Sequence, residues 1–213
     1  VLVEWPEDAG SWQLKAQQEL RARHFAQALA SAERLRALSP GDPTGSYLCG
    51  MALFRLGRMQ EAYAAFGAAM QLSGRDAGCL LFQCRILIGA NQWDEAKKIA
   101  AEVQAAKISD PMLDYCLGRL ASHEDRPDDA IHHYEAVLPA CQDTDNPPDY
   151  AGEVFYRLAC LRYPKADKVS VLALVDAGLR HDENSLSLLE LRADLQRELN
   201  RTDNALATYA RIL

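Results

Sequence analysis

Small side chains recur along this chain at a fixed spacing of thirty-four residues. In the clearest stretch, 46–72, Gly50 and Ala62 lie in two apolar segments that are separated by Leu56-Gly57-Arg58. Steps of thirty-four residues from Ala62 reach Ala28, Ala96 and Ala130. Twelve residues before each of these four alanines stand the small residues Ala16, Gly50, Cys84 and Gly118. Four residues after each of them stand Ala32, Phe66, Ala100 and Tyr134. A fixed period in this range is typical of stacked repeat arrays.

Each period is long enough for two helices, and the abundance of alanine and leucine favours helix over sheet. We predict about six helical hairpins in a repeat domain at 11–213, with repeats at about 11–42, 43–76, 77–110, 111–140, 150–184 and 185–213. Residues 1–10 show no helical period and are predicted to be a leader. The polar segment 141–149 is predicted to be a surface loop inserted between repeats four and five.

Several residues set the predicted ends of these elements. Asp110 and Pro111 are expected to open repeat four as N-cap and first helical residue. Pro139 is expected to end the second helix of that repeat near Leu138, because proline cannot continue a helix. Repeat five is the weakest match, with Ser170 near the place of the recurring alanine. Repeat six is predicted to end within its second helix.

The residues that carry the period resemble the tetratricopeptide repeat family. The motif is matched by Trp12 with Pro40, by Leu56-Gly57 with Ala62, Phe66 and Ala69, and by Gly118 with Ala130 and Tyr134. The resemblance implies an all-α superhelix, a right-handed solenoid whose first helices line a concave groove. Small residues let the helices of a hairpin approach closely, and each hairpin then buries its apolar side against the next.

Charge and cysteine content narrow the class of partner and the compartment. The net charge of −7 argues against a nucleic-acid partner, and no apolar run approaches the roughly 20 residues of a membrane span. None of the six cysteines forms a C-x-x-C pair, so we expect reduced structural thiols and a cytoplasmic location. Because the sequence starts at Val1 without methionine, secretion or a periplasmic location stays open as the alternative.

Motifs for catalysis are missing from the sequence. It contains no phosphate-binding glycine loop that ends in Lys-Ser/Thr and no G-x-S-x-G nucleophile motif. His123, Asp128 and His132 could approach one another across a turn, but we interpret them as solvated surface residues. We therefore expect no enzyme activity within this chain and no cofactor.

The expected groove supplies the better functional signal. The resemblance to the tetratricopeptide repeat family implies a set of groove residues that face a partner. These residues are Tyr47, Met51, Phe54, Arg55, Leu81, Arg85, Tyr115, Arg119 and Tyr156. Tyrosine and arginine are residue types that anchor interfaces. Arg85 and Arg119 share a register, so they could form a positive stripe that suits an acidic peptide. The alternative is that some of these aromatic residues simply pack between hairpins.

These observations predict a non-catalytic protein–protein interaction module or scaffold that holds a peptide or protein segment in its groove. One alternative is the recruiting arm of a larger enzyme, such as a transferase, whose catalytic domain lies outside this chain. Another is self-association through uncapped ends of the array, since the given sequence ends on Tyr-Ala-Arg-Ile-Leu (209–213), which would leave apolar surface uncovered.

Overall fold

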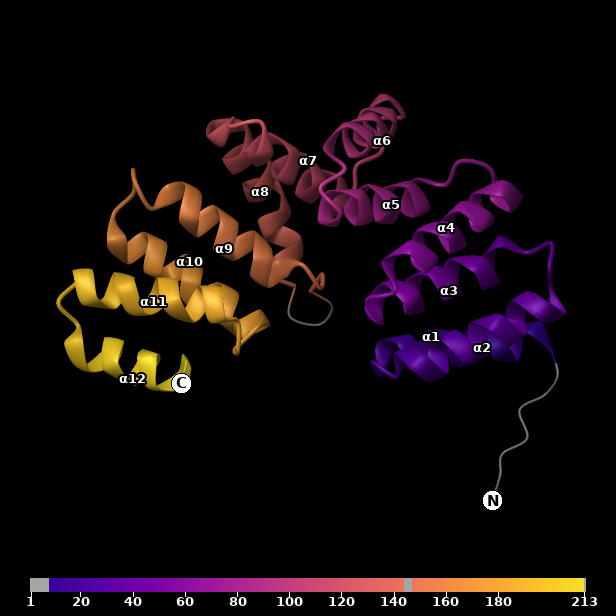
Figure 1. Cartoon of the computed structure of the whole chain (residues 1–213), viewed down its shortest axis with the longest axis horizontal. Coiled ribbons are helices and arrows are strands. Elements are labelled where there is room, and N and C mark those ends of the chain that lie inside the picture. Colours follow the sequence, from indigo (N-terminus) through magenta and orange to yellow (C-terminus); the bar gives the residue numbers. More distant parts are fainter. Residues whose placement is uncertain (1–7, 144–146, 213) are drawn as a thin grey trace, which may run out of the picture. The chain divides into compact units, whose positions relative to one another are not determined.

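The computed structural model describes residues 8–143 and 147–212 of the chain. Within these ranges it contains twelve α-helices and no strand, arranged as consecutive helical hairpins (Figure 1). The chain divides into two compact units, of which the first ends at Ile108 and the second begins at Ser109. The predicted all-α fold of about six hairpins is confirmed.

Unit 1 contains three hairpins. Its helices are α1 (Ala9–Arg21), α2 (Phe25–Leu38), α3 (Pro43–Arg55), α4 (Met59–Ser73), α5 (Ala77–Gly89) and α6 (Trp93–Ala105). Helix α1 begins two residues before the predicted start at Ser11. The Asp8 carboxylate accepts a hydrogen bond of 2.8 Å from the Ser11 backbone N–H, which caps this helix. Ala9 and Gly10 therefore belong to α1, whereas residues 1–7 of the predicted leader lie outside the described residues.

Unit 2 contains three further hairpins. Its helices are α7 (Pro111–His123), α8 (Pro127–Cys141), α9 (Ala151–Arg162), α10 (Lys168–His181), α11 (Leu186–Glu198) and α12 (Thr202–Ile212). As predicted, Asp110 caps α7, and its carboxylate accepts a hydrogen bond of 2.7 Å from the Met112 N–H.

The prediction that Pro139 ends α8 is wrong. The helix continues to Cys141, which the sequence pattern had placed in the inserted loop, and Pro139 lies inside it. The Cys141 side chain is completely buried, and the Gln142 N–H donates to the Leu138 carbonyl at 3.0 Å. Burial of the thiol and this closing bond offset the backbone hydrogen bond that proline removes.

The recurring small residues form the seams of the hairpins, as predicted. All four recurring alanines, Ala28, Ala62, Ala96 and Ala130, have no exposed surface. In repeat five the equivalent residue is Val171, which is completely buried, and not Ser170, which is exposed. Ala159 stands twelve residues before Val171 and is also fully buried. The insertion therefore shifts the register by seven residues, and the period resumes at Ala205.

The inner turns of five hairpins share a feature that the sequence pattern did not predict. Five residues before the recurring small residue, the backbone adopts a left-handed conformation, with φ of 61°, 77°, 59°, 55° and 57° at Arg23, Gly57, Asn91, Asp125 and Asn200. Glycine and asparagine adopt this conformation readily, and aspartate is also tolerated. Arg23 is the exception in residue type among these five.

Candidate functional site

A cluster of aromatic rings joins α3, α4 and α5 in unit 1. Phe66 stacks on Phe82 with ring centroids 4.9 Å apart and an interplanar angle of 7°. Tyr47 meets the edges of both rings, and Phe54 meets Phe82 edge-on at 5.5 Å. Such pairs contribute about 0.5–1.5 kcal/mol beyond their buried area. The cluster therefore fixes α3 against α5, the first helices of neighbouring hairpins.

Two arginines lie over aromatic rings beside this cluster. The Arg85 Cζ atom is 4.7 Å from the centroid of Phe54, and the Arg55 Cζ atom is 4.8 Å from the centroid of Phe25. Both arginines are of intermediate exposure. Stacking on a ring orients the planar guanidinium while its N–H groups lie at the rim of the plane, where they can meet an acceptor. The first helices of unit 1 thus present two oriented positive charges.

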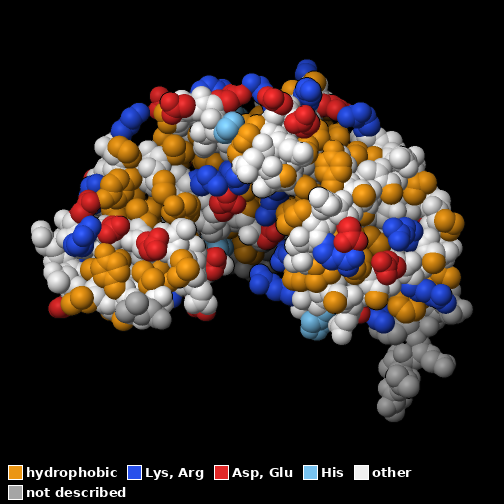
Figure 2. All heavy atoms as spheres, in the orientation of Figure 1, with side chains coloured by type: hydrophobic (Ala, Val, Ile, Leu, Met, Phe, Trp, Pro, Cys, Tyr) orange, Lys and Arg blue, Asp and Glu red, His pale blue; other side chains and the backbone are white. Residues whose placement is uncertain are grey.

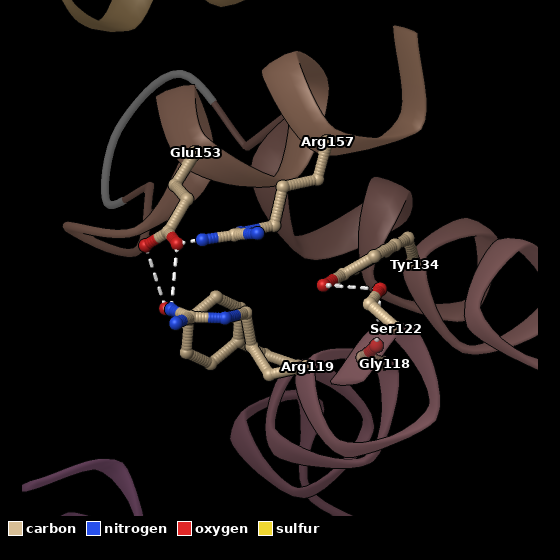
Figure 3. A network of polar contacts seen from close by, with 7 residues as sticks. Gly118, Arg119, Ser122, Tyr134, Glu153 and Arg157 are labelled. Carbon is tan, nitrogen blue, oxygen red and sulfur yellow. Dashed lines mark hydrogen bonds and ion pairs between the residues drawn. The ribbon is translucent and has the colours of Figure 1, made fainter. Parts of the chain in front are cut away.

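Unit 2 contains a polar network centred on Glu153, which lies in the first turn of α9 (Figure 3). Its carboxylate accepts a hydrogen bond of 2.6 Å from the Tyr115 hydroxyl and one of 2.7 Å from Nη1 of Arg119. The Nε of Arg157, one turn further along α9, donates to the same carboxylate at 2.7 Å. Arg119 Nη1 also donates to the Tyr115 oxygen at 3.1 Å. We call these four residues the Glu153 cluster.

The Glu153 cluster shifts the ionisation of its carboxyl group. Burial opposes the charged form of Glu153, but Arg119, the Tyr115 hydroxyl and Arg157 together outweigh burial and hold its pKa below the ordinary value of 4.5. Glu153 is therefore ionised at neutral pH. Because Tyr115 and Arg119 belong to α7, the cluster ties the first helices of two successive hairpins together.

Tyr115 and Tyr134 anchor this region in the interior. The Tyr115 ring stacks on Tyr150 with centroids 4.5 Å apart, and both side chains are almost completely buried. The Ser122 hydroxyl donates to the Gly118 carbonyl at 2.8 Å and lies 3.4 Å from the Tyr134 hydroxyl (Figure 3). Burial raises the pKa of Tyr134, so its hydroxyl stays neutral.

The structure divides the predicted partner-facing residues into two groups. Side chains of intermediate exposure belong to Tyr47, Met51, Arg55, Arg85, Arg119 and Tyr156. Buried side chains belong to Phe54, Leu81 and Tyr115, with exposed fractions of 9%, 1% and 2%. The buried positions of Phe54 and Tyr115 agree with the alternative interpretation that some of the aromatic residues pack between hairpins, and Leu81 is buried as well.

Glu153 and Arg157 were not among the predicted site residues. The signal available was their spacing of four residues in the first helix of repeat five, which places a glutamate and an arginine on one helix face. Their link to α7 was hidden, because the inserted loop left the register of repeat five uncertain by one residue. The acidic partner of Arg119 therefore lies within the chain itself.

The surface carries shallow hollows with polar as well as apolar linings. One of about 370 Å³ lies beside Tyr47 and Ser73 in unit 1. Another, of about 670 Å³, lies beside Arg180, Arg192 and Arg211 in unit 2. On the face shown in Figure 2, apolar and charged side chains are interspersed.

His123, Asp128 and His132, which we interpret from the sequence as surface residues, are all exposed. His133 Nδ1 lies 2.9 Å from the Asp114 carboxylate, and the rings of His132 and His133 are 5.6 Å apart at an interplanar angle of 63°. Among the described residues, no group of three or more His, Cys, Asp or Glu side chains could hold a metal ion. In the same ranges, no helix is both long enough and apolar enough to cross a membrane.

Comparison with known proteins extends the description of the fold. The family "Anaphase-promoting complex, cyclosome, subunit 3" matches residues 21–103. A chain in the crystal structure of the APC/C hetero-tetramer Cut9-Hcn1 is similar over 98% of this chain and 40% of that one, at 17% identity and a TM-score of 0.83. This chain thus spans less than half the length of that relative. A search of curated proteins found no match.

Two bacterial structures show the same fold. PilF of Pseudomonas aeruginosa aligns over 94% of this chain and 88% of its own, at 15% identity and a TM-score of 0.70. A tetratricopeptide repeat protein from Parabacteroides merdae aligns over 97% of this chain and 78% of its own, at 11% identity and a TM-score of 0.67. Together with the buried seams at a period of thirty-four residues, these likenesses establish the fold: the chain has a tetratricopeptide-like repeat fold.

Proposed function

We propose that this chain is a protein–protein interaction module that binds a partner segment on the first-helix face of unit 1. We define that face by Tyr47, Met51, Arg55 and Arg85 of α3 and α5, which are residues of intermediate exposure. The main support for this proposal is that Arg55 lies over the ring of Phe25 and Arg85 lies over the ring of Phe54.

This composition suits a protein partner. Tyrosine, methionine and arginine are enriched in interfaces, and an arginine that is already oriented loses little freedom on binding. The two positive charges favour a segment that carries Asp or Glu. The buried aromatic cluster beneath keeps α3 and α5 in place, so the face is largely preformed.

The names of the matched proteins give independent support. The matching family is described as subunit 3 of the anaphase-promoting complex, and the Cut9-Hcn1 structure is a hetero-tetramer. Both names refer to proteins within multi-protein assemblies. A role in holding another protein is consistent with this pattern.

The test begins with selection of displayed peptides on the immobilised chain and measurement of their binding in solution by fluorescence anisotropy. The double variant Arg55→Glu/Arg85→Glu should weaken binding at least tenfold, because it reverses both charges. Met51→Ala should also weaken binding, because it removes an apolar side chain from the face and places no new charge beside either arginine. The matched control is Lys97→Glu/Lys98→Glu, which makes the same charge change on exposed positions of α6 and should bind as the wild type does.

Circular dichroism of every variant shows whether the helices remain. If the selected peptides bind the Arg55/Arg85 and Met51 variants as tightly as the wild type, the face is not the binding site.

A further inference from the structure

The Glu153 cluster has more positive than negative charge. Two guanidinium groups, of Arg119 and Arg157, share the one carboxylate of Glu153, so the four residues carry a net charge of +1 at neutral pH. The Tyr115 hydroxyl adds a neutral donor. Two arginines and a tyrosine hydroxyl that converge on one point are a donor set suited to a carboxylate.

Solvent reaches the charged side chains of this cluster, whereas the Tyr115 side chain is buried. The side chain of Arg119 is 16% exposed, and those of Glu153 and Arg157 are each 33% exposed. Glu153 is therefore partly exposed, and its carboxylate is held by polar contacts, although burial still opposes its charged form.

The exchange of one carboxylate for another conserves the hydrogen bonds. An incoming carboxylate would accept from Tyr115, Arg119 and Arg157, while Glu153 would regain its hydration. The energetic difference between the two states is then small compared with the strength of the individual bonds, which is the condition for a displaceable ligand.

We propose that Tyr115, Arg119 and Arg157 form a carboxylate-binding site, that Glu153 is its resident ligand, and that a glutamate side chain of a partner segment replaces Glu153 on binding. The occupant is assigned as a glutamate because the resident ligand is itself a glutamate side chain that projects from a helix. The proposal rests on the proposed function as a protein-binding module. Glu153 then acts as an internal competitor that lowers affinity for acidic segments.

The test uses the full chain and three fluorescent peptides. The first is a short helix-forming peptide of alanine, leucine and glutamate with both ends blocked, and the second has glutamine in place of each glutamate. The third is the glutamine peptide with a free C-terminal carboxylate, which separates a terminal carboxylate from a side-chain carboxylate. Binding is measured by anisotropy at low salt and repeated at high salt.

Glu153→Gln should bind the glutamate peptide about tenfold more tightly than the wild type, because the charged competitor is gone. Glu153→Asp, which keeps the charge but shortens the reach, should change affinity in the same direction. Adding Arg119→Gln to Glu153→Gln should remove the gain. The matched control, Glu190→Gln on an exposed position of α11, should bind as the wild type does.

Three results would overturn the proposal: no gain for Glu153→Gln, an equal gain for the glutamine peptide, or a gain confined to the peptide with the free C-terminus. The first includes the case in which no variant binds the glutamate peptide. If the Arg55/Arg85 variant loses its selected peptides while Glu153→Gln changes nothing, this inference alone fails and the proposed function stands.

Discussion

Gly118 on α7 lies directly against the ring of Tyr134 on α8. A Cβ atom added to Gly118 would come within 2.7 Å of Cε1 of Tyr134, and a Cβ added to Gly50 would come equally close to Cε1 of Phe66. Distances under 3.0 Å require a neighbour to move. Where the first position is Ala16 or Cys84, the second is Ala32 or Ala100. In the first four repeats, glycine thus pairs with an aromatic ring, and a larger first residue pairs with alanine.

Gly118→Ala should lower the free energy of unfolding by about 1–3 kcal/mol, because the added methyl group overpacks the seam against a buried ring. Gly50→Ala should behave alike. The measurement is urea unfolding followed by circular dichroism.

The control for this effect is Gly67→Ala in the middle of α4. An added Cβ there would meet only Gln83 Nε2, at 3.6 Å, which is an ordinary contact. Helix propensity should then dominate and raise stability by about 0.5–1 kcal/mol. Destabilisation by both kinds of variant alike would contradict the seam argument.

Arg23→Asn should stabilise the protein. Arg23 is exposed and holds φ at 61°, which is costly for a side chain of its type, whereas asparagine tolerates this region and occupies the same place at Asn91 and Asn200. The expected gain is about 0.5–1 kcal/mol in urea unfolding. Gly57→Ala, at the equivalent turn, should lose a similar amount. A loss for Arg23→Asn would show that the side chain has a contact worth more than the backbone cost.

The contribution of Glu153 to stability should disappear in acid. Its folded-state pKa lies below the ordinary value of 4.5, so its stabilisation is fully present above that value and is lost as pH falls through the folded pKa. Glu153→Gln should therefore cost about 1–3 kcal/mol at neutral pH. The gap to the wild type should narrow as pH falls through the folded-state pKa of Glu153. Urea titrations across this range measure it, and a gap that does not vary with pH would refute the assignment.

Cys160 should react with iodoacetamide before the other five cysteines do. It is exposed, whereas Cys49, Cys79, Cys84, Cys116 and Cys141 are buried. Burial raises the pKa of Cys49 and Cys141 to about 11 and of Cys79 to about 12, so their reactive thiolate forms are scarce. Peptide mass spectrometry after brief labelling checks this order, with labelling in urea as the control. Uniform native labelling would mean that the hairpins open readily.

The hairpin architecture could be predicted from the sequence because it depends on local spacing. The fully buried Ala28, Ala62, Ala96 and Ala130 all lie on the predicted period, and the turn at Leu56-Gly57-Arg58 separates α3 from α4. The end of α8 could not be predicted, because proline and burial of Cys141 act in opposite directions and only packing decides between them. The left-handed backbone conformation at the inner turns could not be predicted at Arg23, because arginine is not a residue type that favours positive φ.

The candidate site was less predictable. The exposure of Tyr47, Met51 and Arg85 follows from helix register. Whether the Arg119 guanidinium is paired, however, depends on its hydrogen bond to Glu153. That contact joins two helices on either side of an insertion that breaks the period. A register rule can place a side chain on a face, but it cannot say which other side chain reaches it.

The bonds from Tyr115 and Arg119 to Glu153 make the placement of α9 beside α7 less dependent on the covalent link between hairpins four and five. The entropy of closing a flexible connection rises only slowly with its length. A change in the length of the connection between α8 and α9 should consequently cost little stability, which makes that connection a suitable position for an inserted tag, reporter or protease site.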